Sequence, residues 1–165
     1  MATDRTHSPY RCRRAQCGRG FTLLEMMMAV VIVGLLTAVA LPSYSRIIER
    51  QKLLQCERDL LTIATWIERY RLQHVDAPMS LGDLGMSLPK DPWGRDYQFL
   101  NFAAPIKGIK SMIRKDHNLH PLNSEFDLYS LGKDGRSSPP LTAQASRDDV
   151  IWARDGDFVG LASDY

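Results

Sequence analysis

Glu25 is the residue most clearly suited to a functional role, because it is the only charged residue among the apolar residues 21–41. A carboxylate inside a bilayer costs about 2.5–3.5 kcal/mol on insertion scales, so it needs a partner. Cleavage of the chain after Gly20 would create one, the α-amino group of Phe21, four residues before Glu25. In a helical bundle the carboxylate of one copy could neutralise the ammonium group of its neighbour and fix their axial register. We therefore predict that Glu25 acts in assembly.

The apolar segment 21–41 is long enough to cross a membrane, since 21 residues form a helix of about 31 Å. Secretory signal peptides have shorter apolar regions, of about 7–15 residues, followed by a small-residue cleavage site. Residues 41–44 (LPSY) do not supply such a site. A simple signal anchor would explain the length of the segment and the arginines before it, but it would not explain Glu25.

Positive charge is concentrated before this segment. Of the 21 basic and 19 acidic residues, five arginines and one aspartate lie in residues 1–20, which leaves 16 basic and 18 acidic residues. A slightly acidic remainder argues against nucleic acid as a partner, because phosphate binding needs a clustered basic face. Without residues 1–20 the chain also keeps Cys56 as its single cysteine, so it cannot form an internal disulfide.

Pro42 ends the apolar segment and divides the predicted helix into two parts. Proline removes a backbone hydrogen bond and clashes with the carbonyl four residues earlier, so we expect a bend or break there, or a simple membrane exit. Residues 43–77 then show helical periodicity, with two adjacent apolar stripes. One stripe repeats every seven residues (Ile47, Leu54, Leu61), and the other contains Leu60, Ala64, Ile67 and Arg71. We expect one helix from near Phe21 to about His74, with 21–42 in the membrane or filament core and 43–77 amphipathic.

Residues 78–165 read as a loop followed by a small sheet. Alternating side chains predict strands at 96–100 and 125–131, and a weaker third strand at 150–153 or 158–161. The stretch 105–114, with three isoleucines, is a candidate for a further strand. Pro92 and Gly94 suit a type I turn around Trp93. The predicted fold is α+β: a long N-terminal helix packed against a small antiparallel sheet.

The residues around the proposed cut match a known pattern. The run GFTLLE at 20–25, after basic residues and before an apolar stretch, resembles the N-terminus of type IV pilins and pseudopilins. The resemblance implies that a prepilin peptidase cleaves after Gly20 and that the new amine of Phe21 is methylated. It also implies a kink at Pro42. The leader 1–20 would stay in the cytoplasm by the positive-inside rule, with the C-terminal domain in the periplasm.

Three further stretches narrow the resemblance. DPWG at 91–94, DLYSLGKDG at 127–135 and DDVIW at 148–152 resemble the major pseudopilin of type II secretion systems, the G-type subunit. This resemblance implies an inner-membrane subunit, held in lipid before assembly, that polymerises into a periplasmic filament. Its implied partners are other copies of the chain, minor pseudopilins and an inner-membrane assembly platform. The filament would drive export of folded proteins across the outer membrane.

The same resemblance implies a calcium site in the loop 131–149. Calcium takes six to eight hard oxygen ligands, which this loop offers as aspartate carboxylates and backbone carbonyls. The implied ligands are the carbonyls of Leu131 and Ser146 and the carboxylates of Asp134, Asp148 and Asp149. The insert 136–145 makes the loop longer than the family norm. Composition alone favours a solvated turn without an ion, so both interpretations stay open here.

Three other classes of protein compete with this prediction. A major or minor type IV pilin for adhesion, motility or DNA uptake shares the N-terminus, but such pilins usually carry a C-terminal disulfide. A minor pseudopilin would lack the DPWG and SLGKDG features. An enzyme is not expected, because His117 and His120 lie in a polar stretch and the sequence has neither a nucleophile elbow nor a glycine-rich phosphate loop.

Overall fold

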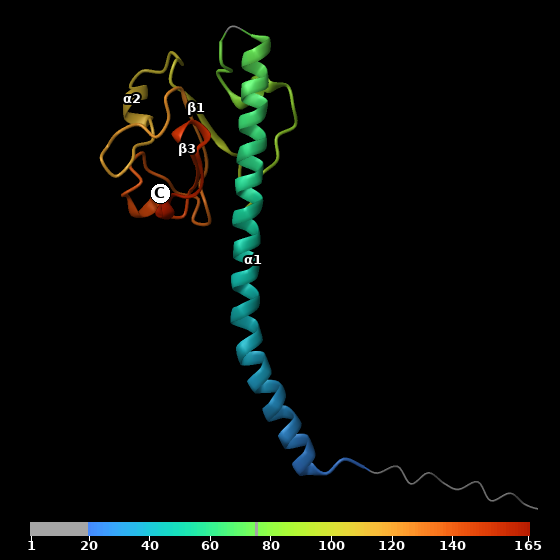
Figure 1. Cartoon of the computed structure of the whole chain (residues 1–165). Helices are drawn as coiled ribbons and strands as arrows, with labels where there is room; N and C mark the ends of the chain where they lie inside the picture. Colours follow the sequence, from blue (N-terminus) through green and yellow to red (C-terminus); the bar gives the residue numbers. More distant parts are fainter. Residues whose placement is uncertain (1–19, 75) are drawn as a thin grey trace, which may run out of the picture. The chain divides into compact units, whose positions relative to one another are not determined.

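The structure is a computed structural model that describes residues 20–74 and 76–165 (Figure 1). The predicted leader therefore lies outside the described residues, apart from Gly20. The chain divides into two compact units, Met1–Ser43 and Tyr44–Tyr165. The first unit contributes the apolar part of the long helix, and the second holds the rest of the helix and the sheet.

Helix α1 spans Leu23–Gln73 and contains Pro42. The helical assignment continues through Pro42, so α1 is not interrupted there. In the second unit the buried positions of α1 are Cys56, Leu60, Ile63, Ala64 and Ile67. Their spacing of three and four residues places them on one face of the helix. All of them except Ala64 are completely inaccessible, and burial of each aliphatic side chain contributes about 1.5–3 kcal/mol.

The two predicted stripes of α1 have different environments. The stripe of Leu60, Ala64 and Ile67 forms the buried face, whereas Ile47, Leu54 and Leu61 are each about half exposed, at 54, 47 and 48%. Arg71 continues the buried stripe at its end and forms an ion pair with Glu125 of the sheet domain. The seven-residue repeat is therefore a surface stripe in the single chain.

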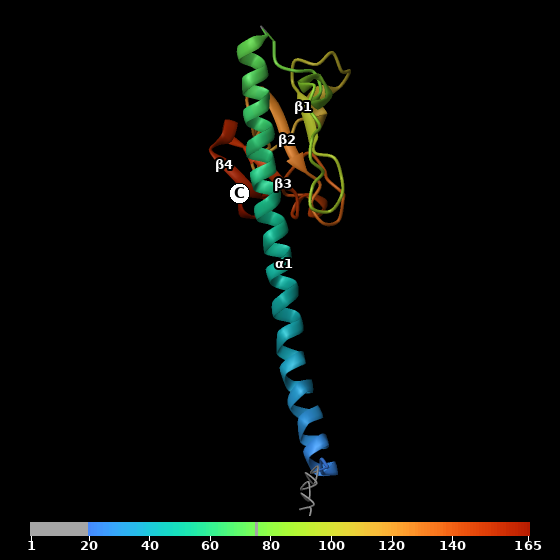
Figure 2. The same ribbon diagram turned by 90° about the vertical axis from the view of Figure 1, so that its right-hand side faces the viewer.

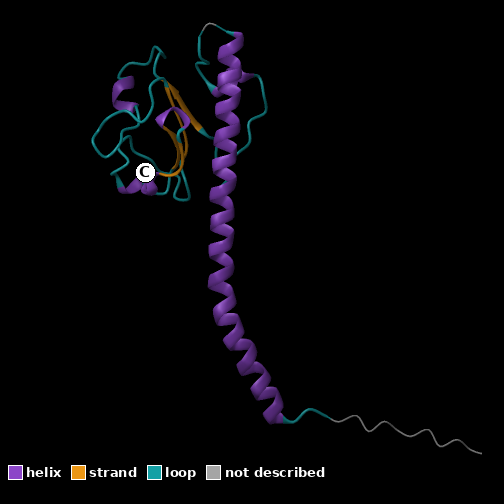
Figure 3. Ribbon diagram, viewed as in Figure 1, coloured by secondary structure: helices purple, strands orange, loops and turns teal. Residues whose placement is uncertain are grey.

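The sheet has four antiparallel strands in sequence order: β1 (Gln98–Asn101), β2 (Phe126–Ser130), β3 (Val150–Ala153) and β4 (Phe158–Leu161). Both candidates for the weaker strand are thus strands, and they pair with each other. Figure 2 shows the strands behind the green part of α1. Figure 3 distinguishes the strands, in orange, from the helices, in purple. The observed α+β arrangement confirms the predicted fold.

The sheet is covered on both faces, which explains why every residue of β3 is buried. Val150 and Trp152 belong to the cluster that contains the buried face of α1. Ile151 and Ala153 point to the other face, into a second cluster with Leu122, Leu141 and Ala162. The alternation along β3 therefore divides the core into two layers.

The predicted strand at 105–114 is wrong. That stretch contains a single helical turn, α2 (Ile109–Met112), preceded by Gly108 with φ +80°. The isoleucines at 106, 109 and 113 are spaced three and four residues apart, which is the period of a helix and not the alternation of a strand. A left-handed residue in the middle of the stretch also interrupts an extended path.

Candidate functional site

The N-terminal candidates lie at the first turn of α1. Gly20 and Phe21 precede the helix, and the ring of Phe21 is exposed. The backbone N–H of Glu25 donates to the hydroxyl of Thr22 at 3.2 Å. Thr22 therefore acts as the N-cap, which places Glu25 in the first helical turn, where a carboxylate interacts favourably with the free N–H groups. The cleavage, methylation and assembly roles of these residues stay predictions.

The apolar part of α1 has no cover within the described residues. None of the most apolar window of this helix is buried, and its length and composition suffice to cross a membrane. The exposed group includes Leu24, Met27, Val31 and Leu35. Such a surface is stable only when lipid or other helices cover it. Pro42 lies one residue beyond this segment.

Three of the implied calcium ligands have hydrogen-bond partners inside the loop itself. The carbonyl of Leu131 accepts the N–H of Gly135 at 3.2 Å. Asp134 Oδ1 accepts the N–H of Arg136 at 2.7 Å, and Asp148 Oδ2 accepts the N–H of Asp134 at 2.8 Å. Gly132 has φ +61°, and a Cβ added there would lie 2.0 Å from the carbonyl oxygen of Asp148. Only glycine allows this close approach of the two ends of the loop.

Of the other two implied ligands, Asp149 is bound by two side chains that sequence reasoning missed. Asp149 is completely buried, and its Oδ2 accepts from Arg114 Nη2 at 2.5 Å and from the Ser137 hydroxyl at 2.6 Å. The carbonyl of Ser146 accepts the N–H of Asp149 at 3.3 Å. Arg114 has no local sequence signal that points to Asp149, since 35 residues separate them.

Calcium binding stays a prediction. Among residues 20–74 and 76–165, no group of three or more acidic, histidine or cysteine side chains converges as a metal-binding cluster. One implied ligand atom still lacks a partner, because Asp149 Oδ1 is buried without a hydrogen bond in the described part of the chain. The five implied oxygens are thus close in sequence but are mainly engaged by protein donors.

The DPWG turn is tied to the same loop through Asp91. The turn is closed by the N–H of Gly94, which donates to the carbonyl of Asp91 at 2.8 Å, as the predicted turn requires. The buried Asp91 carboxylate accepts from the N–H of Arg95 at 2.7 Å and from the hydroxyl of Ser130 at 2.7 Å. Arg95 then donates to the carbonyl of Gly132 at 2.6 Å. These contacts join the DPWG turn to the SLGKDG stretch.

Cys56 lies in the core of the second unit. Burial raises the pKa of its thiol to about 12, and the hydrogen bonds of Tyr97 and Ser130 offset only part of this effect. The neighbouring Tyr97 hydroxyl donates to Asp59 of α1 at 2.9 Å, and burial also raises the pKa of Tyr97. A thiol that is buried and protonated at neutral pH is a packing residue and a poor nucleophile.

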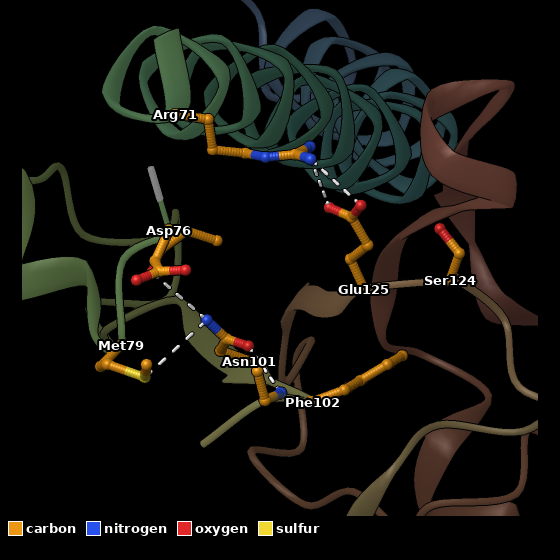
Figure 4. A pocket seen from close by; sticks show the side chains of 9 residues that line it. Arg71, Asp76, Met79, Asn101, Phe102, Ser124 and Glu125 are labelled. Carbon is orange, nitrogen blue, oxygen red and sulfur yellow. Dashed lines mark hydrogen bonds and ion pairs between the residues drawn. The ribbon is translucent and has the colours of Figure 1, made fainter. Parts of the chain in front are cut away.

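An open groove of about 500 Å³ lies near the C-terminal end of α1 (Figure 4). Two of its charged side chains, Arg71 and Glu125, form an ion pair at 2.9 Å, and Arg71 also pairs with Glu68 at 3.0 Å. Asn101 donates to the carbonyl of Pro78 at 2.9 Å, which closes the loop after the helix. Arg71, Glu125 and Asn101 therefore serve the fold of the domain.

These features define the class of protein. An apolar, membrane-length N-terminal helix that continues onto a four-stranded antiparallel sheet is the arrangement of a pilin-like subunit. Residues 17–41 match the family described as the prokaryotic N-terminal methylation motif. No solved structure matches the chain at a significant level.

Curated relatives give the particular family. The chain is 31% identical to the type II secretion system core protein G of Pseudomonas aeruginosa, over 75% of this chain and 88% of the relative. It is 31% identical to the protein of the same name from Aeromonas hydrophila, over 72 and 85% of the two chains, and 30% identical to that of Escherichia coli (strain K12), over 71 and 83%. The chain belongs to the family of type II secretion system core protein G.

Proposed function

We propose that this chain is the structural subunit of a type II secretion pseudopilus and that it polymerises through its N-terminal helix. The observation that carries the proposal is the uncovered apolar part of α1 with Glu25 as its single charge, in a member of the core protein G family. The subunit would wait in the inner membrane as a single-pass protein with its C-terminal domain in the periplasm. The arginine-rich residues 1–20 would hold the N-terminus in the cytoplasm.

Processing prepares the helix for assembly. A prepilin peptidase would remove residues 1–20, and the new amino group of Phe21 would be methylated. The methylated amine keeps its positive charge, so it remains a partner for the carboxylate of Glu25 in a neighbouring subunit. A misaligned pair of helices would leave both charges unpaired in low dielectric. The ion pair would therefore fix the axial register between neighbouring subunits.

Assembly replaces lipid contacts with helix contacts. An inner-membrane platform would extract each subunit, and residues 21–42 would pack among the same segments of other copies. Minor pseudopilins would complete the filament, and the growing periplasmic filament would move folded proteins through the outer membrane. The subunit itself would be non-catalytic, so a separate cytoplasmic motor would hydrolyse the ATP. A type IV pilin is the less favoured function, because the relatives are secretion proteins and Cys56 cannot form an internal disulfide after processing.

Complementation tests the proposal. A bacterium that lacks its own core protein G is supplied with this chain or with Glu25→Ala, and secretion of a folded substrate is measured. We expect the natural chain to restore secretion and Glu25→Ala to reach the membrane in equal amount without restoring it. The proposal fails if the chain is processed and inserted but secretion stays absent, or if Glu25→Ala secretes normally.

A further inference from the structure

A buried arginine closes the loop 131–149 onto the sheet domain. Arg114 is 2% exposed and Asp149 is completely inaccessible, and their side chains form an ion pair at 2.5 Å. Arg114 lies in the segment between α2 and β2, and Asp149 lies at the end of the loop, directly before β3. The pair therefore joins two segments that flank neighbouring strands.

The same guanidinium also contacts the insert that lengthens the loop. Arg114 Nη1 donates to the carbonyl of Ser138 at 2.9 Å and to the hydroxyl of Ser137. The Ser137 hydroxyl donates in turn to Asp149 Oδ2 at 2.6 Å. The guanidinium carbon lies 4.3 Å from the centroid of the Tyr129 ring on β2, a distance at which a cation is attracted to the ring face.

We propose that the guanidinium of Arg114 supplies the positive charge that holds the loop 131–149 in place, so that its closed form does not depend on a bound calcium ion. A planar cation with several donors can neutralise a buried carboxylate and bind two chain segments at once, which is what a structural metal ion does. The insert 136–145 provides the serine partners that make this possible.

Electrostatics and the other implied ligands support this assignment. A divalent cation at Asp149 would lie close to the guanidinium, and two like charges in a buried site repel strongly. Asp134 and Asp148 already accept backbone N–H groups at 2.7 and 2.8 Å. Calcium is the rival that a test must exclude, because Asp149 Oδ1 is buried and has no partner in the described part of the chain.

Thermal melting of the full chain in detergent distinguishes a loop held by Arg114 from a loop held by calcium. We expect the Tm to be the same, within about 1 °C, in millimolar calcium and in a chelator, because the cation is a side chain. Arg114→Met should lower the Tm by at least about 5 °C, since it leaves Asp149 buried and uncompensated. Arg147→Met, at an exposed position of the same loop, is the matched control and should change the Tm by no more than about 1 °C.

Two results of the melting experiments would overturn the proposal. One is a Tm of the natural chain that rises by several degrees with calcium and falls with the chelator; the other is an Arg114→Met chain as stable as the natural one. If Arg114→Met does not fold, the double variant Arg114→Met/Asp149→Leu removes both charges and should fold. Calorimetric titration of the natural chain with calcium gives an independent answer: saturable binding that Asp149→Asn abolishes contradicts the proposal, and no binding supports it. These readouts concern stability and calcium, so they can fail while the proposed role in secretion stands.

Discussion

The hydroxyl of Tyr97 donates a 2.9 Å hydrogen bond to the carboxylate of Asp59, and this bond joins the segment before β1 to the middle of α1. Both residues lie beside the buried Cys56, at the centre of the contact between helix and sheet. The pair is one of the few polar contacts in an otherwise apolar interface, so it fixes the position of the sheet along the helix axis. Its worth can be measured directly.

Tyr97→Phe removes only this hydroxyl and keeps the buried ring. We expect a loss of about 1–2 kcal/mol in the free energy of unfolding, because Asp59 keeps part of its access to water and can be rehydrated. Urea unfolding of the full chain in detergent measures it. Tyr44→Phe, on the exposed part of α1, serves as the control. Equal stabilities of Tyr97→Phe and the natural chain would show that the bond contributes nothing.

Two neighbouring helix positions distinguish the buried stripe from the surface stripe. Ile63 is completely inaccessible and Leu61 is 48% exposed. Ile63→Ala should cost about 2–5 kcal/mol of unfolding free energy, through lost burial and a cavity. Leu61→Ala should cost less than about 1 kcal/mol in the single chain. Similar losses for the two variants would contradict the packing of α1 described above.

We expect the thiol of Cys56 to be alkylated slowly in the folded chain. Its thiol is completely buried and its pKa is raised to about 12, so little thiolate is available at pH 8. The test uses a chain in which Cys12 and Cys17 are replaced by serine, treated with iodoacetamide with and without urea. We expect labelling only after unfolding. Rapid labelling without urea would mean that this part of the core is open.

We expect the carboxyl group of Asp127 to make the stability of the folded chain depend on pH. Burial raises its pKa to about 6, and the N–H of Arg114, the side chain of Asn123 and the charge of Arg114 offset only part of that. Between pH 4 and 6 the folded chain therefore holds a proton that the unfolded chain has released. The stabilisation from this group is complete below about pH 4 and is lost as the pH rises through about 6.

The comparison of the natural chain with Asp127→Asn isolates this effect. The variant loses an acceptor, because the carboxylate takes hydrogen bonds from Arg114 N–H at 2.6 Å and Asn123 Nδ2 at 3.1 Å. That penalty does not depend on pH. The stability difference between the two chains should shrink by up to about 3 kcal/mol from pH 4 to 7. A stability difference that stays constant between pH 4 and 7 would refute the raised pKa.

The features that could be predicted from the sequence are those that depend on the local spacing of apolar residues. The buried stripe of Leu60, Ala64 and Ile67 and the strand β2 follow from helical and alternating spacing. The stretch 105–114 forms a helical turn and not the predicted strand, because its isoleucines have helical spacing although β-branched residues favour strands. Periodicity also could not decide which of two stripes on α1 faces the sheet, since that depends on a domain that follows much later in the chain.

The candidate site was predictable only in part. Glu25 stands out because a single charge in an apolar run is costly, whatever the tertiary structure. Arg114 does not stand out, because its partner is 35 residues away and its burial depends on how the insert 136–145 folds. Asp149 was assigned to calcium by resemblance, and nothing in its local sequence points to a guanidinium as an alternative partner.

The most direct test of the central claim is to isolate the filaments that this chain forms and determine the N-terminus of their subunits by mass spectrometry. The chain is produced together with a type II secretion apparatus that lacks its own core protein G. We expect filaments whose subunits begin at a methylated Phe21, and none from Glu25→Ala although that chain is inserted. Filaments whose subunits retain residues 1–20, or normal filaments from Glu25→Ala, would contradict it.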